Sequence, residues 1–247
     1  MSAASMWSLA RYQQTKFEKL AESVSRLKAY DSPFDQAEEI LTRYKQHATV
    51  EDQPCTASSC KFTIVLKNFL VDNHVPVRTR WFDSKLLRLF GVRPAAVVAR
   101  AAIKDGTVQE SELAAAYEST RGAWIWASWS SVVHLSLASK CENLALGRES
   151  SYMVTTGHTN QSNMHGPYVS ATFEPSINDS ERARCQYIRF DCMTSLIECA
   201  NNGSVGARKF MPRVEQDIAD TETIRQVHPE QYSDAVHRCL YGTQKIK

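Results

Sequence analysis

The chain has 247 residues, of which 43% are hydrophobic and 23% are charged, proportions typical of a folded globular protein. This length allows one sizeable core and is slightly long for a single domain. The 29 basic and 27 acidic residues leave a net charge of only +2, and no long run of lysine or arginine occurs. The composition therefore argues against a nucleic-acid partner.

Residues 6–30 predict an amphipathic helix with a net basic charge. Its apolar side chains recur at helical spacing: Phe17, Leu20, Val24 and Leu27. This pattern fits a helix that packs on its own domain. It also fits a basic juxtamembrane segment that lies on an anionic membrane surface, in which case residues 1–30 are peripheral to the fold.

No stretch of the sequence is both long and apolar enough to cross a membrane. The nearest one, residues 122–139, is interrupted by serines and by His134, and residues 1–15 lack the apolar core of a signal peptide. From Trp129 to Leu137, an extended chain would place every second side chain on the same side: Trp129, Ser131, Val133, Leu135 and Leu137. This period of two predicts a strand with one buried face.

The remaining elements follow the order helices, strands, helices. A helix begins at Ser32-Pro33 and ends near His47, Asp105-Gly106 marks a hairpin, and Asn178 caps a helix that runs to about Cys199. Further strands are expected at residues 61–70, 95–104, 107–119, 152–156 and 168–173, and further helices at residues 83–90 and after Pro229.

This order predicts an α+β fold, with an antiparallel β-sheet of about five or six strands and helices packed on one face. We divide the chain into an N-terminal amphipathic helix (1–30), a single α+β domain (31–212) and a helical C-terminal extension (213–247).

Three tryptophans are the candidates for a ligand surface. On a strand, Trp124 and Trp126 share one face and Trp129 takes the other. Aromatic faces can stack on sugars, on bases or on apolar ligands, and they also fill the core beneath a sheet. The sequence leaves both interpretations open.

Two histidines, His158 and His165, lie in a segment that predicts a flexible polar loop, where they could share a metal ion. The segment contains no carboxylate and no cysteine, so two solvated histidines are favoured over a metal site, and we expect no cofactor. The GxSxG, P-loop, GxGxxG and HExxH motifs are absent. An enzyme would therefore need an active site assembled from distant residues.

The chain has seven cysteines, so at least one thiol stays free if the others pair. Cys55 and Cys60 flank a short polar loop and are predicted to bond to each other. Cys185, Cys192 and Cys199 recur every seven residues, which places them about 10 Å apart along one side of an intact helix. We expect Cys192 and Cys199 to be structural, either bonded outside the helix or to one another if the helix breaks between them.

Several motifs together resemble a group of uncharacterised bacterial proteins. These motifs are Ser32-Pro33-Phe34, Pro54-Cys55-x4-Cys60, the Asp105-Gly106 hairpin, and Phe190-x-Cys192-x6-Cys199 followed by Met211-Pro212. In that group a single N-terminal membrane anchor precedes an extracytoplasmic domain. The resemblance spans most of residues 32–212. It implies an extracytoplasmic or periplasmic location, with the anchor missing from this chain.

Together, these observations predict an extracytoplasmic binding or interaction domain with structural disulfides. The alternatives are a hydrolytic enzyme with a non-local active site, and a cytoplasmic location. An open sheet face with exposed tryptophan favours the binding domain. A cleft that joins a histidine to a carboxylate or a serine favours the enzyme.

Overall fold

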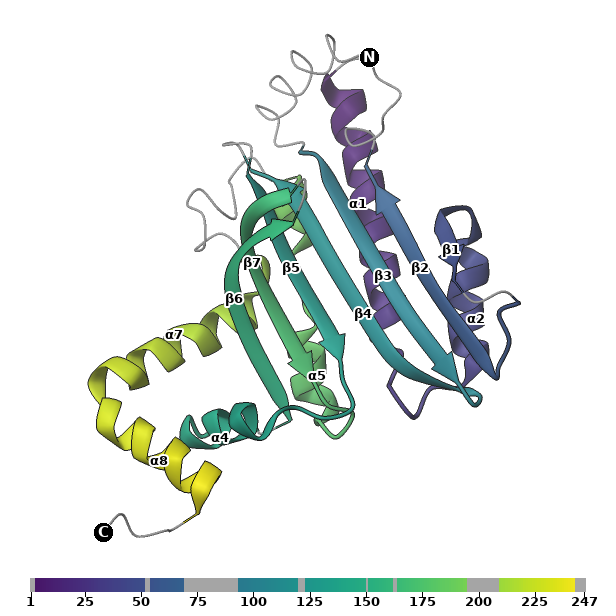
Figure 1. Cartoon of the computed structure of the whole chain (residues 1–247). Helices are drawn as coiled ribbons and strands as arrows, with labels where there is room; N and C mark the ends of the chain where they lie inside the picture. The colour runs from purple at the N-terminus through teal and green to yellow at the C-terminus, as the bar shows by residue number, and fades with distance from the viewer. Residues whose placement is uncertain are drawn as a thin grey trace.

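A seven-stranded sheet forms the centre of the computed structural model, with the strand order β1-β2-β3-β4-β5-β7-β6 (Figure 1). The strands are β1 (Ala48–Val50), β2 (Ser59–Lys67), β3 (Ala95–Lys104), β4 (Thr107–Glu118), β5 (Trp124–Ser131), β6 (Tyr152–Gln161) and β7 (Met164–Phe173). The structure describes residues 3–51, 54–68, 93–119, 123–149, 151–161, 164–194 and 209–242. The short helix expected at residues 83–90 lies outside them.

The predicted α+β class is confirmed, with slightly more strands than expected and a mixed sheet. β5 and β7 run parallel, while the other neighbouring pairs run antiparallel. The predicted hairpin joins β3 to β4. Asp105 and Gly106 both adopt positive φ angles, of 52° and 83°, as a tight two-residue turn between twisted strands requires.

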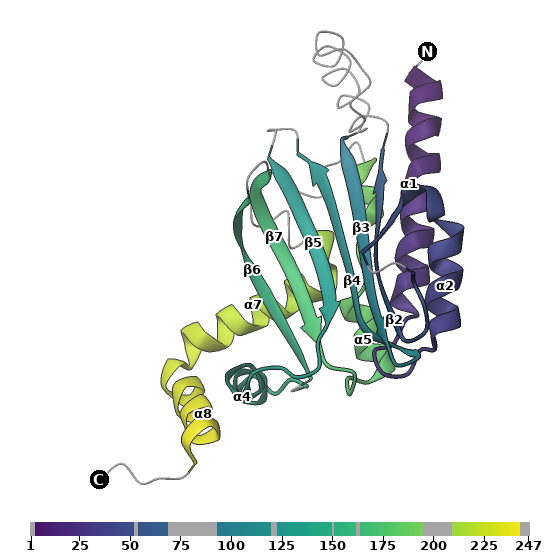
Figure 2. The ribbon, with the colours of Figure 1, turned by 45° about the vertical axis from the view of Figure 1, so that its right-hand side comes forward.

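The helices provide the second layer of the fold. They are α1 (Ala3–Ser25), α2 (Phe34–Arg43), α4 (Leu137–Ala145), α5 (Asp179–Cys185), α7 (Pro212–Val227) and α8 (Pro229–Tyr241), with short 3-10 helices η1 (Lys45–His47) and η2 (Phe190–Met193). Figures 1 and 2 show α1, α2 and α5 on the same side of the sheet. None of the helices in the described part of the chain combines the length and apolarity that a membrane span requires.

Helix α1 belongs to the core, which corrects the prediction that residues 1–30 are peripheral. Phe17, Leu20, Val24 and Leu27 are each at most 3% exposed and are members of the hydrophobic core cluster. Their apolar stripe faces the sheet, so it is not available to a membrane surface.

The two C-terminal helices, within the predicted extension 213–247, meet the fold in different ways. In α7, Val214 and Asp217 are buried, and Val214 belongs to the same core cluster as α1. Helix α8, by contrast, has no buried residue. It lies beside α4, where a disulfide joins Cys239 to Cys141 with a Cα–Cα distance of 5.5 Å.

The alternating segment after Trp129 does not continue as a strand. β5 ends at Ser131, and α4 begins at Leu137 with Ser136 as its N-cap, whose side chain accepts a hydrogen bond from Ser139 N. Leu137 is 61% exposed. The alternating pattern beyond Ser131 therefore does not form a strand, because Ser136 caps the start of a helix there.

The helix expected from Asn178 to about Cys199 ends at Cys185 instead. Asn178 caps it as predicted. Beyond the helix, Ile188 and Phe190 are buried while Tyr187 is 60% exposed, and Arg189 N donates to the carbonyl of Phe210. In an extended segment Ile188 and Phe190, two residues apart, lie on the same face and can both be buried. In a continued helix they would lie on different faces.

Candidate functional site

The candidate site is the sheet face opposite α1, α2 and α5, which we call the open face. Among the described residues, no helix packs across it (Figure 2). Along β5 the exposure alternates residue by residue, so that Ile125, Ala127 and Trp129 are buried and the residues between them are partly exposed. The open face therefore displays every second residue of β5 and of its neighbours.

Three aromatic side chains gather at one end of the open face. Trp124 and Trp126 have ring centroids 6.3 Å apart and planes tilted by 35°. Tyr168 is the register partner of Trp126 on the adjacent strand β7. All three are partly exposed. They form what we call the aromatic cluster.

Two glycines shape the backbone around this cluster. A Cβ atom added to Gly157 would lie only 2.7 Å from Cε1 of Tyr168, so the tyrosine ring lies directly against the β6 backbone. A Cβ atom on Gly166 would lie 1.7 Å from the carbonyl oxygen of Trp124. Both positions require glycine because a neighbouring group approaches the main chain closely.

Hydroxyl groups occupy the next positions of the open face between β5 and β7. Ser128 donates to Ser170 at 3.0 Å, and Ser130 lies 3.4 Å from Thr172, oxygen to oxygen. The open face thus offers aromatic rings at one end and a row of small hydroxyl side chains along the two strands.

Of the three candidate tryptophans, Trp124 and Trp126 lie on the open face and Trp129 lies on the opposite, buried face. Trp129 is fully buried, with its ring centroid 5.9 Å from that of Phe173, so it belongs to the core and is removed from the candidate surface. Sequence reasoning missed Tyr168. The alternation in residues 168–173 predicted a strand, but nothing in the sequence indicated that this strand lies parallel to β5.

The two candidate metal ligands lie in strands, which corrects the prediction of a loop. His158 is in β6, where it pairs with Pro167, and His165 is in β7, where it pairs with Asn160. β6 and β7 pair antiparallel, so both histidines occupy paired strand positions. In the described ranges, no group of three histidine, cysteine or acidic side chains is placed to hold a metal ion.

The cysteine pairs fit an oxidising environment. The structure joins Cys55 to Cys60, the pair expected from the sequence, with a Cα–Cα distance of 4.5 Å. Cys192 is disulfide-bonded, and Cys199 lies outside the described residues. The Cys141–Cys239 bond spans 98 residues, a separation that gives no local signal in the sequence.

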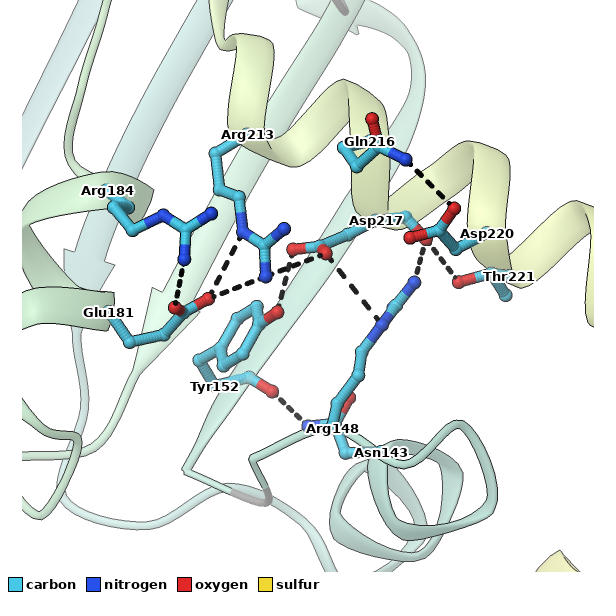
Figure 3. A network of polar contacts seen from close by, with 10 residues as sticks. All are labelled: Asn143, Arg148, Tyr152, Glu181, Arg184, Arg213, Gln216, Asp217, Asp220 and Thr221. Carbon is cyan, nitrogen blue, oxygen red and sulfur yellow. Dashed lines mark hydrogen bonds and ion pairs between the residues drawn. The ribbon is translucent and has the colours of Figure 1, made fainter.

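A buried polar network ties α7 to the rest of the fold (Figure 3). Its centre is Asp217, which is 2% exposed and accepts a hydrogen bond of 2.7 Å from the Tyr152 hydroxyl. Arg213 lies 3.5 Å from the Asp217 carboxylate and also contacts Glu181 at 3.2 Å. Arg148 donates to the Asp217 backbone carbonyl.

The network favours protonated, unreactive groups. Burial raises the pKa of Tyr152, and the hydrogen bond to Asp217 raises it further. Burial, together with the nearby carboxylates of Glu181 and Asp217, raises the pKa of Cys185 to about 12. We therefore interpret the network as a structural connection and not as a catalytic centre.

Cys185 is expected to resist alkylation in the folded protein. It is free and fully buried, and its raised pKa keeps the thiol protonated at pH 8. Iodoacetamide labelling, followed by peptide mass mapping, should proceed at least about a hundredfold more slowly in the native protein than after unfolding in guanidinium. Rapid native labelling at this site would contradict the buried, protonated thiol and revive a thiol-enzyme interpretation.

A hydrolase would need a histidine oriented by a carboxylate, and one such pair, His134 and Glu174, lies near the start of α4. His134 Nδ1 lies 3.9 Å from Oε1 of Glu174, but the histidine side chain is 81% exposed. The Glu174 oxygen already lies 2.9 Å from Lys140 Nζ, and it also accepts a hydrogen bond from Leu135 N. Burial by itself would raise the pKa of Glu174, but the hydrogen bonds from Lys140 and from Leu135 N outweigh it and lower that pKa below its usual value. The carboxylate is therefore engaged in holding the start of α4.

Comparison of the chain with known proteins returns no match among protein-family models, curated proteins or solved structures. The chemistry of the open face and of the cavities is therefore the basis for a functional proposal.

Proposed function

We propose that this protein is an extracytoplasmic binding domain that holds a neutral saccharide chain on the open face. The observation that carries the proposal is the aromatic cluster of Trp124, Trp126 and Tyr168 beside a row of hydroxyl side chains. Rings that lie on a sheet can stack on the apolar faces of sugar rings, and neighbouring hydroxyls can exchange hydrogen bonds with those of the sugar.

One ion pair on the open face is compatible with a neutral ligand. Arg100 and Glu112 neutralise each other across β3 and β4, with 3.1 Å between Nη1 and Oε2. Because this pair is balanced, it adds no excess charge that would select a strongly anionic or cationic chain.

The disulfides support the proposed location. Bonds such as Cys55–Cys60 and Cys141–Cys239 persist in oxidising compartments and are rare in the cytosol. The resemblance to anchored bacterial proteins implies the same location.

Replacing Trp126 by alanine is expected to weaken saccharide binding at least tenfold, about 1.4 kcal/mol, because the central ring of the cluster is lost. Isothermal titration calorimetry with two neutral oligosaccharides, cellohexaose and hexa-N-acetylchitohexaose, measures the effect. Tyr168→Ala should lower affinity in the same direction.

The matched control is Trp7→Ala, which removes a tryptophan that is 43% exposed on α1, away from the open face. This variant should bind as the unaltered protein does. Equal losses in Trp7→Ala and Trp126→Ala, or no saturable binding of either oligosaccharide, would count against the proposal.

A further inference from the structure

The β6 edge of the sheet offers a place for one further strand. β6 is the outermost strand and pairs with β7 alone among the strands of the sheet. Beside it, a cleft of about 170 Å³ lies between β6, α4 and α7. Figures 1 and 2 show that α7 continues outward past β6, so the helix reaches beyond the last strand of the sheet.

Val154 and Thr156 direct their backbone N–H and C=O groups away from β7. In β7, the Phe173 carbonyl accepts a hydrogen bond from Val132 N, on the β5 side. Alternate residues of a strand direct these groups to opposite sides, and the register partners of Val154 and Thr156 lie two and four residues before Phe173. Those partners therefore also face β5, which leaves the backbone groups of Val154 and Thr156 pointing out of the sheet.

The start of β6 shows the same outward direction. The Tyr152 carbonyl, two residues before Val154, accepts a hydrogen bond from the Asn143 side chain of α4. Within the described ranges, no group bonds to the corresponding positions of Val154 and Thr156, and both residues line the cleft. A row of N–H and C=O groups at strand spacing is complementary to a second extended backbone.

The sequence of β6 contains no feature that would block a further strand. Native sheets protect exposed edges with charged side chains, prolines or very short strands. The opposite edge follows this rule, since β1 has three residues. β6 has ten residues and contains no proline, lysine, arginine, aspartate or glutamate. A long edge without these protections favours the addition of a strand.

Helix α7 supplies a floor for such a strand. Ile218, Thr221 and Arg225 line the cleft, and their spacing of three and four residues places them on one side of the helix. Alternate side chains of an added strand would rest on this side of α7. Because α4 and α7 both border the cleft, it fits a single extended chain better than the edge of a second folded copy.

The charges that line the cleft balance one another. Two are acidic, Glu142 and Glu222, and two are basic, Arg148 and Arg225. Arg225 lies 3.4 Å from Glu142, and Arg148 donates to the Asp217 carbonyl. The cleft therefore offers no excess charge to a ligand, which favours an uncharged segment.

We propose that the β6 edge binds an uncharged extended peptide, which pairs with Val154 and Thr156 as an eighth strand of the sheet. The proposal does not depend on saccharide binding by the open face.

Titration of the isotopically labelled protein with the peptide acetyl-Thr-Val-Thr-Val-Thr-amide, followed by NMR, tests it. The β-branched residues favour the extended conformation. Binding should saturate, with the largest amide shift changes at Val154 and Thr156. Two versions of the peptide, methylated at the backbone nitrogens of either the valines or the threonines, are the matched probes. Because alternate amides face opposite edges of a strand, one version should lose at least about tenfold in affinity and the other should bind as the parent peptide does.

Two variants at one position separate the backbone from the side chain. Thr156→Pro removes the N–H that would donate to the peptide, and Thr156→Ala keeps it. The proline variant should bind the peptide at least about tenfold more weakly than the alanine variant. Both should melt at nearly the temperature of the unaltered protein, because this N–H points out of the sheet.

A second pair of variants protects the test against a folding defect in Thr156→Pro. Thr221→Trp fills the cleft from α7 and should abolish binding. Thr223→Trp places the same ring on an exposed position of α7 outside the cleft and should leave binding unchanged. Both threonines donate to the carbonyl four residues earlier, so the two changes remove equivalent bonds.

The proposal is overturned if the peptide fails to saturate below about 10 mM, if both methylated peptides bind equally, or if Thr221→Trp and Thr223→Trp bind the parent peptide equally well. It is also overturned if sedimentation shows a dimer of the unliganded protein that Thr156→Pro dissociates, because a second copy would then occupy the edge.

Discussion

Replacing Leu20 by alanine is expected to lower the free energy of unfolding by about 2–5 kcal/mol. Leu20 is fully buried in the C-terminal half of α1 and belongs to the same core cluster as residues of the sheet. The substitution removes apolar contacts and leaves a cavity between helix and sheet. Urea denaturation followed by circular dichroism measures the loss.

The adjacent residue provides the control for this prediction. Lys19 is exposed on the same helix, so Lys19→Ala should change stability by less than about 0.5 kcal/mol. Deletion of residues 1–28 should prevent cooperative folding, because it removes Phe17, Val24 and Leu27 together with Leu20. A deleted chain that melts at nearly the original temperature would show that α1 is peripheral after all.

Replacing Asp217 by alanine is expected to cost about 3–5 kcal/mol, the range for removing one partner of a buried ion pair. Asp217 is 2% exposed, and the change leaves Arg213 and the Tyr152 hydroxyl without their common acceptor. The loss should appear in the same denaturation experiment. Loosening of α7 should accompany it, measured as faster amide hydrogen exchange.

The comparison variant is Asp220→Ala, one turn further along α7. Asp220 is exposed and accepts a hydrogen bond of 3.1 Å from Gln216 Nε2, so its loss should change stability by less than about 0.5 kcal/mol. Tyr152→Phe should cost about 0.5–1.5 kcal/mol, because it removes one hydrogen bond and leaves the ion pair in place. If Asp217→Ala and Asp220→Ala were equally stable, the network would not hold α7.

Local patterns in the sequence were sufficient for part of this structure. Asp105-Gly106 specifies a tight turn whatever lies around it, and the alternation of Trp124 and Trp126 with Ile125 fixes which side chains share a face. The loop between Cys55 and Cys60 is so short that few other partners compete. Each of these inferences depends on residues within one turn or one strand.

Contacts between distant segments were not readable from the sequence. The aromatic cluster is complete only because β7 pairs with β5 in parallel, which brings Tyr168 beside Trp126. An amphipathic helix such as α1 has the same pattern whether its apolar stripe meets a sheet or a membrane. The seven-residue spacing of Cys185 and Cys192 indicates one helix, yet burial of Ile188 and Phe190 favours an extended segment between them.

Solution NMR of the isotopically labelled protein, titrated with cellohexaose, tests the saccharide-binding proposal most directly. The proposal predicts the largest chemical-shift changes at the indole N–H groups of Trp124 and Trp126 and at the β7 amides around Tyr168, with intermolecular nuclear Overhauser effects to these rings. Helices α1 and α5 should show little change. Shift changes confined to α1 and α5, or none across β5 and β7 at saturating sugar, would contradict binding at the open face.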